Sequence, residues 1–271
     1  MKKEFLPGDK WIYYKIYCGT TTTNYILLYS IKPLVKMLLE ENIINKWFFI
    51  RYKDIDSHLR LRLLLNDTNS LGRVIKALNE SFKFYLDSGQ IWDLQINTYK
   101  REIRRYGSNT MKISETFFFN DSENIIKMIE NSRDDEELFV FAFKYIESII
   151  KLFNFSEDFL MSFLDTMQKS FKEELGADKT KTKKSLSLMY RKFQKKIHLA
   201  SQKIEVDNLK YLVNQIILIK QEDKLEVNIE ELLSSYLHMS LNRIFSNNQR
   251  VFEMVIYDFL NREYKSKSAR L

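Results

Sequence analysis

The stretch that decides the fold runs Trp47-Phe-Phe-Ile-Arg51-Tyr-Lys-Asp-Ile-Asp-Ser-His58-Leu-Arg60-Leu-Arg62-Leu63. It holds two strand-like runs, 47–52 and 58–65, joined by a turn-prone Asp-Ile-Asp-Ser segment. In the second run, leucines alternate with polar residues at the period of two that is typical of a strand. His58, Arg60 and Arg62 are therefore predicted to share one face, with the leucines on the other. Such a cationic row is suited to binding carboxylates, but a solvated face of an antiparallel sheet would show the same alternation.

The flanking segments place this hairpin in a larger sheet. We expect further strands over 11–18 and from 91 onward, a helix over 24–42 that bends or restarts near Pro33, and a helix over 70–88 that ends at Gly89. Thr23 or Asn24 is expected to cap the first helix. After Gly107 the apolar period changes to about 3.6, which predicts helices over 113–131, 134–153, 157–175, 184–202, 208–219 and 229–245.

This order of elements predicts an α+β fold. The N-terminal part, up to about residue 110, is expected to form a mostly antiparallel sheet, and the helical C-terminal part is expected to pack on it. With six Gly and two Pro, no stretch has the composition of a flexible linker. We therefore expect a single domain over 1–271, sheet-bearing over 1–107 and helical over 108–271.

The bulk composition narrows the class of protein. A content of 45% hydrophobic and 14% aromatic residues is enough for a sizeable core. The single cysteine, Cys18, excludes an internal disulfide and a multi-cysteine metal site within one chain, and indicates a reduced, cytoplasmic setting. The N-terminal residues lack the apolar core of a signal peptide, and no run approaches the roughly 20 apolar residues of a membrane span. The sequence therefore predicts a soluble protein without a membrane span.

The charge balance is basic, with 43 Lys and Arg against 36 Asp and Glu. A net charge of +7 can attract nucleic acid, an anionic membrane or an acidic ligand. The basic residues are densest over 179–184 and 191–196, where Met189, Phe193 and Ile197 recur at helical spacing. This pattern is typical of the outer face of an amphipathic helix, with a nucleic-acid or peptide-docking surface as the alternative. No zinc-finger spacing or RNA-binding aromatic motif accompanies it, so we expect no direct nucleic-acid binding.

Three histidines are few enough to consider singly, and His238 is the one in an unusual setting. In a helix over 229–245, His238, Asn242 and Arg243 lie on adjacent rows beside an apolar face. Buried polar groups need hydrogen-bond partners. Either a functional site or a purely structural hydrogen-bond network would provide them. His198, among Lys and Gln, is predicted to be a surface residue. The sequence has no Gly-rich phosphate loop, zinc-binding helix or nucleophile elbow, so no metal or cofactor is expected.

Six segments with these features occur in a characteristic order along the chain. They are Trp11-Ile-Tyr-Tyr-Lys-Ile-Tyr17, Trp47-Phe-Phe-Ile-Arg-Tyr52, His58-Leu-Arg-Leu-Arg62, Tyr99 with Glu102-Ile-Arg-Arg-Tyr-Gly107, Glu115 with Phe117-Phe-Phe-Asn-Asp-Ser122, and Leu237-His-Met239 with Asn242-Arg243. Taken together, they resemble the family formed by the C-terminal, glutamate-eliminating domain of class I lantibiotic dehydratases and the stand-alone thiopeptide-type bacteriocin biosynthesis proteins. The resemblance covers essentially the whole chain.

The resemblance implies a peptide-modifying lyase. A separate tRNA-dependent enzyme would attach glutamate to Ser or Thr of a ribosomal precursor peptide with a leader, and this chain would eliminate the glutamate to leave dehydroalanine or dehydrobutyrine. The resemblance implies that His238 transfers the proton, oriented by Asn242 or a neighbour, and that Arg60 and Arg62 act with it. The implied substrate-binding residues are Arg51, His58, Asn242 and Arg243, while Glu102 and Arg105 brace the sheet.

One departure from the family pattern keeps other functions open. Members that eliminate glutamate resemble one another in an arginine just after the first strand, where this chain has Cys18-Gly-Thr-Thr-Thr-Thr-Asn24. A related branch resembles pyridine synthases, which join two dehydroalanines of a thiopeptide precursor by a formal [4+2] cycloaddition and need no glutamate pocket. A non-catalytic peptide-binding module is the third alternative. An edge strand could take up a leader by β-augmentation, and a homodimer is compatible with the sequence.

Overall fold

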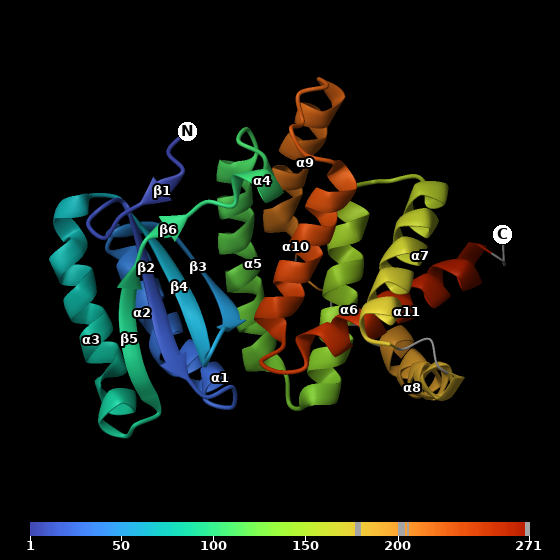
Figure 1. Ribbon diagram of the computed structural model, residues 1–271, viewed down its shortest axis with the longest axis horizontal. Coiled ribbons are helices and arrows are strands. Elements are labelled where there is room, and N and C mark those ends of the chain that lie inside the picture. The colour runs from blue at the N-terminus through green and yellow to red at the C-terminus, as the bar shows by residue number, and fades with distance from the viewer. Residues whose placement is uncertain (177–179, 200–203, 205, 269–271) are drawn as a thin grey trace.

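A four-stranded antiparallel sheet forms the centre of the N-terminal part (Figure 1). The computed structural model describes residues 1–176, 180–199, 204 and 206–268. The strands are β2 (Trp11–Cys18), β3 (Ile44–Lys53), β4 (Ser57–Leu65) and β5 (Ile91–Asn97), in the spatial order β3-β4-β2-β5. Two short strands that the sequence does not predict as separate elements, β1 (Glu4–Phe5) and β6 (Tyr99–Lys100), pair with each other. The α+β class with an antiparallel sheet is confirmed.

The strand register confirms the alternation in β4. His58 lies opposite Tyr17 of β2 and Tyr52 of β3, so the three side chains share a face that continues through Arg60 and Arg62. The leucines between them are fully buried on the other face. However, His58 is only 1% exposed and Arg62 only 7%. The alternative of an ordinary solvated sheet face is therefore wrong for these two residues.

Two helical segments cover the leucine face of the sheet. The first consists of α1 (Thr23–Ile26), a π-helical turn (Leu27–Ile31) and α2 (Lys32–Glu40), and the second is α3 (Leu71–Asp87) after a short 3₁₀ turn (Thr68–Ser70). The restart expected near Pro33 is confirmed, since Pro33 lies in the first turn of α2, directly after the π-helical turn that accommodates a ring without an N–H. Gly89 follows α3 with φ of +69°, as its predicted capping role requires.

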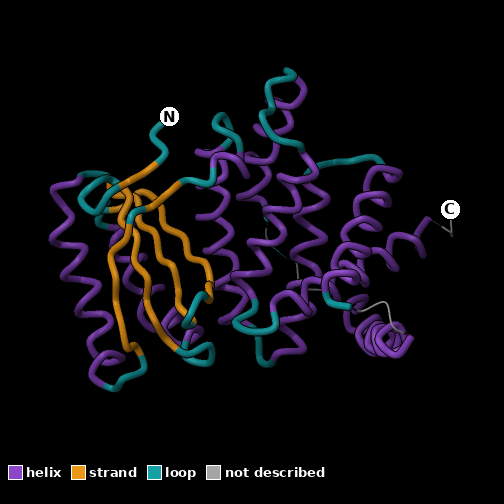
Figure 2. Tube along the Cα trace, viewed as in Figure 1, coloured by secondary structure: helices purple, strands orange, loops and turns teal. Residues whose placement is uncertain are grey.

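The chain beyond Gly107 is helical, as predicted, and Figure 2 shows the strands confined to the other side of the molecule. After a short α4 (Ile103–Tyr106), the helices are α5 (Met111–Asn131), α6 (Asp135–Leu152), α7 (Glu157–Glu174), α8 (Thr180–Leu199), α9 (Asp207–Gln221), α10 (Ile229–Ile244) and α11 (Gln249–Ser268). Residues 200–202, the last three of the predicted helix 184–202, lie outside the described residues. Lys179 of the basic cluster lies outside them as well.

Helix α11 is the one long helix that the sequence does not predict. Every residue from Glu253 to Leu260 is buried, as is Asn261, because α11 lies among α6, α7, α8 and α10. A helix that is enclosed on all sides needs no polar stripe, so the periodicity that marks an amphipathic helix is absent. Its polar side chains are instead paired with neighbouring helices, as between Asp258 and Lys172 of α7 at 2.7 Å.

The helical part docks on the sheet through the outer edge of β3. Asn242 of α10 accepts a hydrogen bond from the Arg51 N–H at 3.0 Å and donates one to the Arg51 carbonyl at 2.9 Å. Arg243 Nε donates to the Phe49 carbonyl at 2.8 Å, and Ser122 Oγ of α5 accepts from the Phe49 N–H at 3.4 Å. Side chains of two helices thus replace a neighbouring strand at this edge, and they fix α10 against the sheet.

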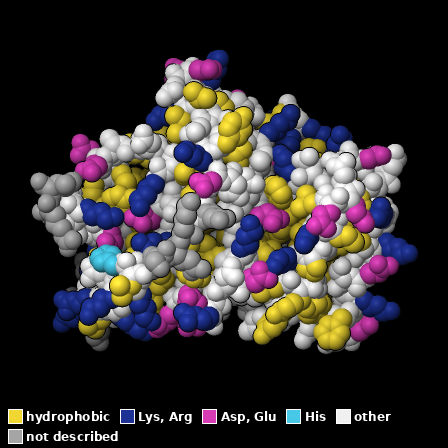
Figure 3. Space-filling view, turned by 180° about the vertical axis from the view of Figure 1, so that it is seen from behind, with side chains coloured by type: hydrophobic (Ala, Val, Ile, Leu, Met, Phe, Trp, Pro, Cys, Tyr) yellow, Lys and Arg dark blue, Asp and Glu magenta, His cyan; other side chains and the backbone are white. Residues whose placement is uncertain are grey.

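The basic face of α8 behaves as an amphipathic surface. Phe193 and Ile197 are buried, while Lys192 and Lys196 both pair with Glu136 of α6. Figure 3 shows basic side chains gathered at the lower left of the view, beside a histidine, and basic and acidic side chains interspersed over the centre and right of this face. In the part of the chain that the structure describes, no helix combines the length and apolar character that crossing a bilayer requires.

Candidate active site

Arg60 is held in one orientation by two neighbours. Its Nε donates a hydrogen bond to Nε2 of His58 at 3.1 Å, and its guanidinium carbon lies 3.3 Å from the ring centroid of Tyr52. Because Nε2 of His58 accepts this bond, Nδ1 carries the proton and donates to the Asp56 carbonyl at 3.0 Å. Burial lowers the pKa of His58, which favours this neutral form. Neither Nη group of Arg60 bonds to a described residue, so both are available to a carboxylate.

Arg62 carries a buried guanidinium without an anionic partner. It makes no hydrogen bond or ion pair with any residue that the structure describes, and its Nε is fully buried. Three aromatic rings surround it instead, with centroids at 4.6 Å for Tyr13, 5.0 Å for Tyr99 and 5.2 Å for Phe48. Burial lowers the pKa of Arg62 because the charged form loses its hydration. An incoming anion would therefore be strongly stabilised at this position.

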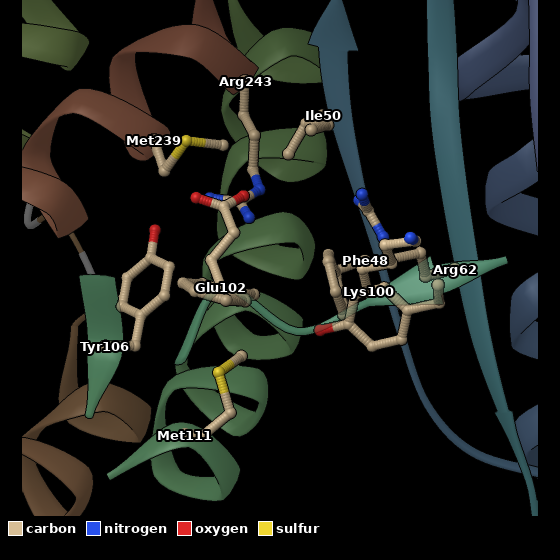
Figure 4. A pocket seen from close by; sticks show the side chains of 11 residues that line it. Phe48, Ile50, Arg62, Lys100, Glu102, Tyr106, Met111, Met239 and Arg243 are labelled. Carbon is tan, nitrogen blue, oxygen red and sulfur yellow. The ribbon is translucent and has the colours of Figure 1, made fainter. Parts of the chain in front are cut away.

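Arg62 lines a small cavity between the sheet and the helices (Figure 4). The cavity has a volume of about 20 Å³, which is room for about one water molecule. Arg243 and Met239 of α10 line the opposite side, with Glu102 between the two elements in the view of Figure 4. Like Arg62 Nε, Arg243 Nη2 is buried with no hydrogen-bond partner among the residues described. Both arginine residues thus line the same small cavity, and each has a buried donor without a described partner.

A larger cleft of about 660 Å³ opens at the end of β3 and β4. Its described lining includes three cations, Arg51, Lys53 and Arg250, and no carboxylate. His58 and Tyr52, which hold Arg60, also line it, and so does Asn242. Three of the predicted substrate-binding residues therefore meet at one cleft. Its lining gives it a positive potential that favours an acidic ligand.

Arg51 lines the large cleft from the other face of the sheet. It pairs with Leu59 in the β3–β4 register, so it occupies the other pleat from Arg60 and Arg62. Its Nε donates to the Arg243 carbonyl at 2.9 Å, Nη1 to Thr23 Oγ1 at 2.5 Å and Nη2 to Asn24 Oδ1 at 2.6 Å. The expectation that Thr23 or Asn24 caps the first helix is wrong, because Thr22 is the residue that precedes α1. Thr23 and Asn24 accept hydrogen bonds from Arg51 instead. Binding of a ligand by Arg51 stays a prediction.

His238 is oriented by a carboxylate on α11 and not by Asn242. Its Nδ1 lies 3.0 Å from Oε2 of Glu253, a fully buried side chain that also accepts from Gln249 Nε2 at 2.7 Å and from Arg250 Nη1 at 3.3 Å. The carboxylate therefore holds the proton on Nδ1 and leaves Nε2 as the basic nitrogen. His238 is 27% exposed, and its Nε2 bonds to none of the described residues. Gln249 and Arg250, which donate to Glu253, line the large cleft, whereas His238 and Glu253 are not among its described lining residues.

Asn242 and Arg243 have structural partners. The two hydrogen bonds of Asn242 go to the backbone of Arg51, which rules it out as the group that orients His238. Arg243 is fully buried and forms an ion pair at 2.8 Å with Asp121 of α5. Both residues therefore fasten α10 to the sheet and to α5. Substrate binding by these two side chains stays a prediction, and Arg243 Nη2 is the donor that remains for it.

Glu102 and Arg105 lie beside the site, at the start of α4. Arg105 Nε donates to Ser235 Oγ of α10 at 2.9 Å, and its Nη1 lies 3.4 Å from Glu102. Arg105 therefore braces α4 against α10, and not against the sheet as the sequence suggests. His198 is half-exposed and contacts Glu263 at 3.0 Å, as expected of a surface residue. Among the residues described, no three His, Cys, Asp or Glu side chains gather as metal ligands would.

Two residues of the site are not identified by the sequence reasoning. Glu253 lies in the helix that was not predicted, and no motif connects it with His238. Asp121 belongs to the quoted segment Phe117–Ser122, but only the fold shows that it faces Arg243. A signal exists for Glu253, which is an acidic residue within an apolar run, because a buried carboxylate must have a partner. Asp121 gives no such signal, since it lies in the polar run from Asn120 to Asn124.

Residues 11–264 match the family described as lantibiotic biosynthesis dehydratase C-term. The chain belongs to this family. Among curated members, it is 26% identical to the nisin biosynthesis protein NisB of Lactococcus lactis subsp. lactis, over 98% of this chain and 26% of NisB. It is also 26% identical to the epidermin biosynthesis protein EpiB of Staphylococcus epidermidis, over 89% of this chain and 24% of EpiB. The chain thus spans about a quarter of the length of these relatives.

Solved structures of the lantibiotic dehydratase C-terminal family support the fold. The tRNA-dependent lantibiotic dehydratase MibB from Microbispora sp. 107891 matches with a TM-score of 0.68 at 17% identity, over 94% of this chain and 29% of MibB. The pyridine synthase TbtD from thiomuracin biosynthesis matches with a TM-score of 0.67 at 12% identity, over 95% of this chain and 99% of TbtD. The fold is therefore common to proteins that differ in reaction and in length.

Proposed function

We propose that this chain eliminates glutamate from glutamylated Ser and Thr side chains of a precursor peptide, leaving dehydroalanine or dehydrobutyrine. One observation carries the proposal: Arg60 and Arg62 present guanidinium donors that no described residue uses. A buried or half-buried cation without a counter-ion is costly to maintain, and a substrate with carboxylates supplies the missing partner. The identity of 26% to the nisin biosynthesis protein NisB and the epidermin biosynthesis protein EpiB supports a role in making a peptide of this kind.

The reaction is a proton abstraction followed by loss of a carboxylate. A base removes the α-proton of the glutamylated residue, and the electrons of that C–H bond form the Cα–Cβ double bond. The Cβ–O bond breaks, and glutamate departs with both electrons of that bond as a carboxylate. The atoms and charges balance without a cofactor. The enzyme must therefore supply a base, stabilise an enolate-like charge and receive the departing anion.

The side chains of the site divide these roles between them. Nε2 of His238 takes the α-proton, while Glu253 holds the imidazole in the required tautomer. Arg60 receives the departing carboxylate through its two Nη groups, and His58 positions Arg60. Arg62 lines the small cavity and not the large cleft, so its buried charge stabilises the developing anion at longer range. Arg51 and Arg243 contribute positive potential, and their hydrogen bonds together with that of Asn242 hold α10 against β3.

The proposed partners follow from this reaction. The substrate is a ribosomal precursor peptide that carries a leader, and a separate tRNA-dependent enzyme attaches the glutamate. The cleft of about 660 Å³ is large enough for a modified side chain with its flanking backbone. Its cationic lining suits the negative charge that glutamylation adds to the peptide.

Formation of a pyridine ring is the second candidate, and one observation favours it. Residues 20–24 lack the arginine expected of eliminating members. In this reaction the substrate holds two dehydroalanines, and the product is released together with water and the leader.

Mass spectrometry separates the candidates. The purified protein is incubated with a chemically glutamylated precursor and, separately, with a leader-bearing peptide that contains two dehydroalanines. Loss of glutamic acid from the first peptide supports elimination, whereas leader release from the second supports ring formation. Unchanged masses for both peptides would leave the non-catalytic binding module and refute the proposal.

Variants test the assigned residues in the same assay. We expect His238→Ala and Arg62→Ala to abolish the loss of glutamate. His198→Ala and Arg73→Ala are matched controls, because both side chains are exposed and pair with acidic residues far from the cleft. Full activity of His238→Ala would exclude His238 as the base, and the thermal unfolding of each variant shows whether it is folded.

A further inference from the structure

The two edges of the sheet differ in their exposure. At the β3 edge, Asn242, Arg243 and Ser122 satisfy the outward backbone groups of Phe49 and Arg51. At the other edge, β5 pairs only with β2, and no described residue forms a further backbone–backbone hydrogen bond to 91–97. Residues 92, 93, 95 and 96 of β5 are all exposed. The outer side of β5 is therefore free to pair with another extended chain.

The sequence of β5 lacks the features that keep an edge strand from pairing. Edge strands of monomeric proteins are usually shielded by Lys, Pro or a central bulge. β5 reads Ile91-Trp-Asp-Leu-Gln-Ile-Asn97, with no Lys or Pro and a single charge, and its register shift lies at the first residues only. Trp92 is 51% exposed and Ile96 39%. An unshielded edge with exposed apolar side chains is a liability unless a partner covers it.

The β5 edge is continuous with the site. Gln95 pairs with Lys15 of β2, and Lys15 pairs with Arg60 of β4, so all three side chains lie on one face of the sheet. A strand added to β5 would extend this face by one row. From that strand, β3 at the mouth of the cleft is four strand spacings away, roughly 19 Å. About six extended residues span this distance.

We propose that the β5 edge binds an extended recognition segment of the peptide substrate by β-augmentation, while a residue at least about six positions away occupies the cleft. The inference rests on the proposed function for the identity of the substrate. Because successive side chains of a strand point to opposite faces, the segment should alternate apolar and uncharged polar residues. The apolar set lies beside Leu94 and Ile96, and the polar set beside Gln95 and Asn97.

Trp92 makes the binding directly measurable. Trp11 and Trp47 are 2% and 1% exposed, so acrylamide quenches the fluorescence of Trp92 selectively. The probe is an acetylated and amidated peptide that alternates valine with threonine and matches the 7 residues of β5. We expect the probe to protect Trp92 from acrylamide and to shift its emission to the blue. Unchanged quenching at high peptide concentration would overturn the proposal.

Methylation of the peptide backbone distinguishes strand pairing from other binding. In an added strand, only alternate N–H groups face β5, so N-methylation of one alternate set removes the pairing and N-methylation of the other set leaves it intact. We expect one series to weaken binding by at least about tenfold, and the other to bind like the parent peptide. Equal affinities in both series would show that main-chain pairing is not involved.

A variant of the edge provides the complementary test. Ile96→Lys adds the charge that shielded edges carry, at an exposed position where folding should not suffer. We expect Ile96→Lys to lower the affinity for the probe by about tenfold. Tyr29→Lys is the control, since Tyr29 is 68% exposed on the helical side of the sheet. Equal binding by Ile96→Lys and the parent protein would overturn the proposal.

Binding of the probe and elimination are separable in this design. The probe carries no glutamate, so its affinity is measured in the His238→Ala variant as well as in the parent protein. If elimination fails but the probe still protects Trp92, the β5 inference stands and the proposed reaction does not. If Ile96→Lys eliminates glutamate from a precursor as efficiently as the parent protein does, the β5 inference fails and the reaction stands.

Discussion

The contact between Glu253 and His238 gives the sharpest test of the proposed chemistry. Replacing Glu253 by Gln keeps the volume and an acceptor oxygen, and it removes the negative charge beside Nδ1. Gln249 and Arg250 both donate to Oε2 of Glu253, so the amide oxygen is the atom expected to remain in that position. The hydrogen bond from His238 is then retained in its neutral form.

The expected decrease in the rate of elimination follows from the loss of the negative charge of Glu253. A hydrogen bond to a charged acceptor contributes about 1.5–3 kcal/mol, and a neutral one about 0.5–1.5 kcal/mol. As His238 takes the proton, the variant should therefore lose roughly 1–1.5 kcal/mol of stabilisation, which corresponds to about a tenfold lower rate of elimination. Stability should not fall, because Glu253 is fully buried and its Oε1 has no described partner.

A double-mutant cycle decides whether Glu253 acts through His238. Single-turnover release of glutamate is followed by mass spectrometry in the parent protein, Glu253→Gln, His238→Ala and the double variant. We expect Glu253→Gln to slow the parent about tenfold and to have no effect on the residual rate of His238→Ala. An equal slowing in both backgrounds would mean that Glu253 acts on the fold, and it would refute the assigned role.

Three further predictions concern the cations of the site. Arg62→Met should abolish elimination without lowering the melting temperature, because it removes a buried charge that lacks a counter-ion. Asp121→Asn should lower the free energy of unfolding in urea by about 3–5 kcal/mol, because it leaves Arg243 buried without its ion pair. Burial lowers the pKa of His58 from 6.5, so its contribution to stability is complete above about pH 6.5 and is lost as the pH falls toward the folded-state pKa. His58→Gln should make the melting temperature less dependent on pH in that range, and an unchanged dependence would exclude His58 as its source.

Local patterns were sufficient to predict much of the fold. The alternation in β4 gives the correct face for His58, Arg60 and Arg62, because the period of a strand is a property of neighbouring residues. The restart at Pro33 and the left-handed Gly89 follow from the conformations that these two residues favour. The solvent exposure of the polar face could not be predicted, because it depends on the distant helices that cover it.

Contacts between distant segments were the part that sequence reasoning could not supply. Arg51 is near Arg60 in the sequence, yet the register of the β3–β4 hairpin places the two on opposite pleats. Glu253 reaches His238 only because the chain turns between α10 and α11. The polar groups of α11 are paired inside the helical part, so they produce no periodic pattern. Such pairs are set by tertiary packing, which a single sequence does not encode at any fixed spacing.

The segment without the expected arginine nevertheless borders a positive charge. Thr23 and Asn24 both accept hydrogen bonds from Arg51, and neutral acceptors leave the charge of a guanidinium uncompensated. Arg250, by contrast, pairs with Glu174 and Glu253. Burying cations such as Arg51 and Arg62 without counter-ions opposes folding, and a reaction between two uncharged dehydroalanines would offer no anion to offset that cost. Elimination generates a carboxylate at each turnover, so the charge balance of the site favours elimination over cycloaddition.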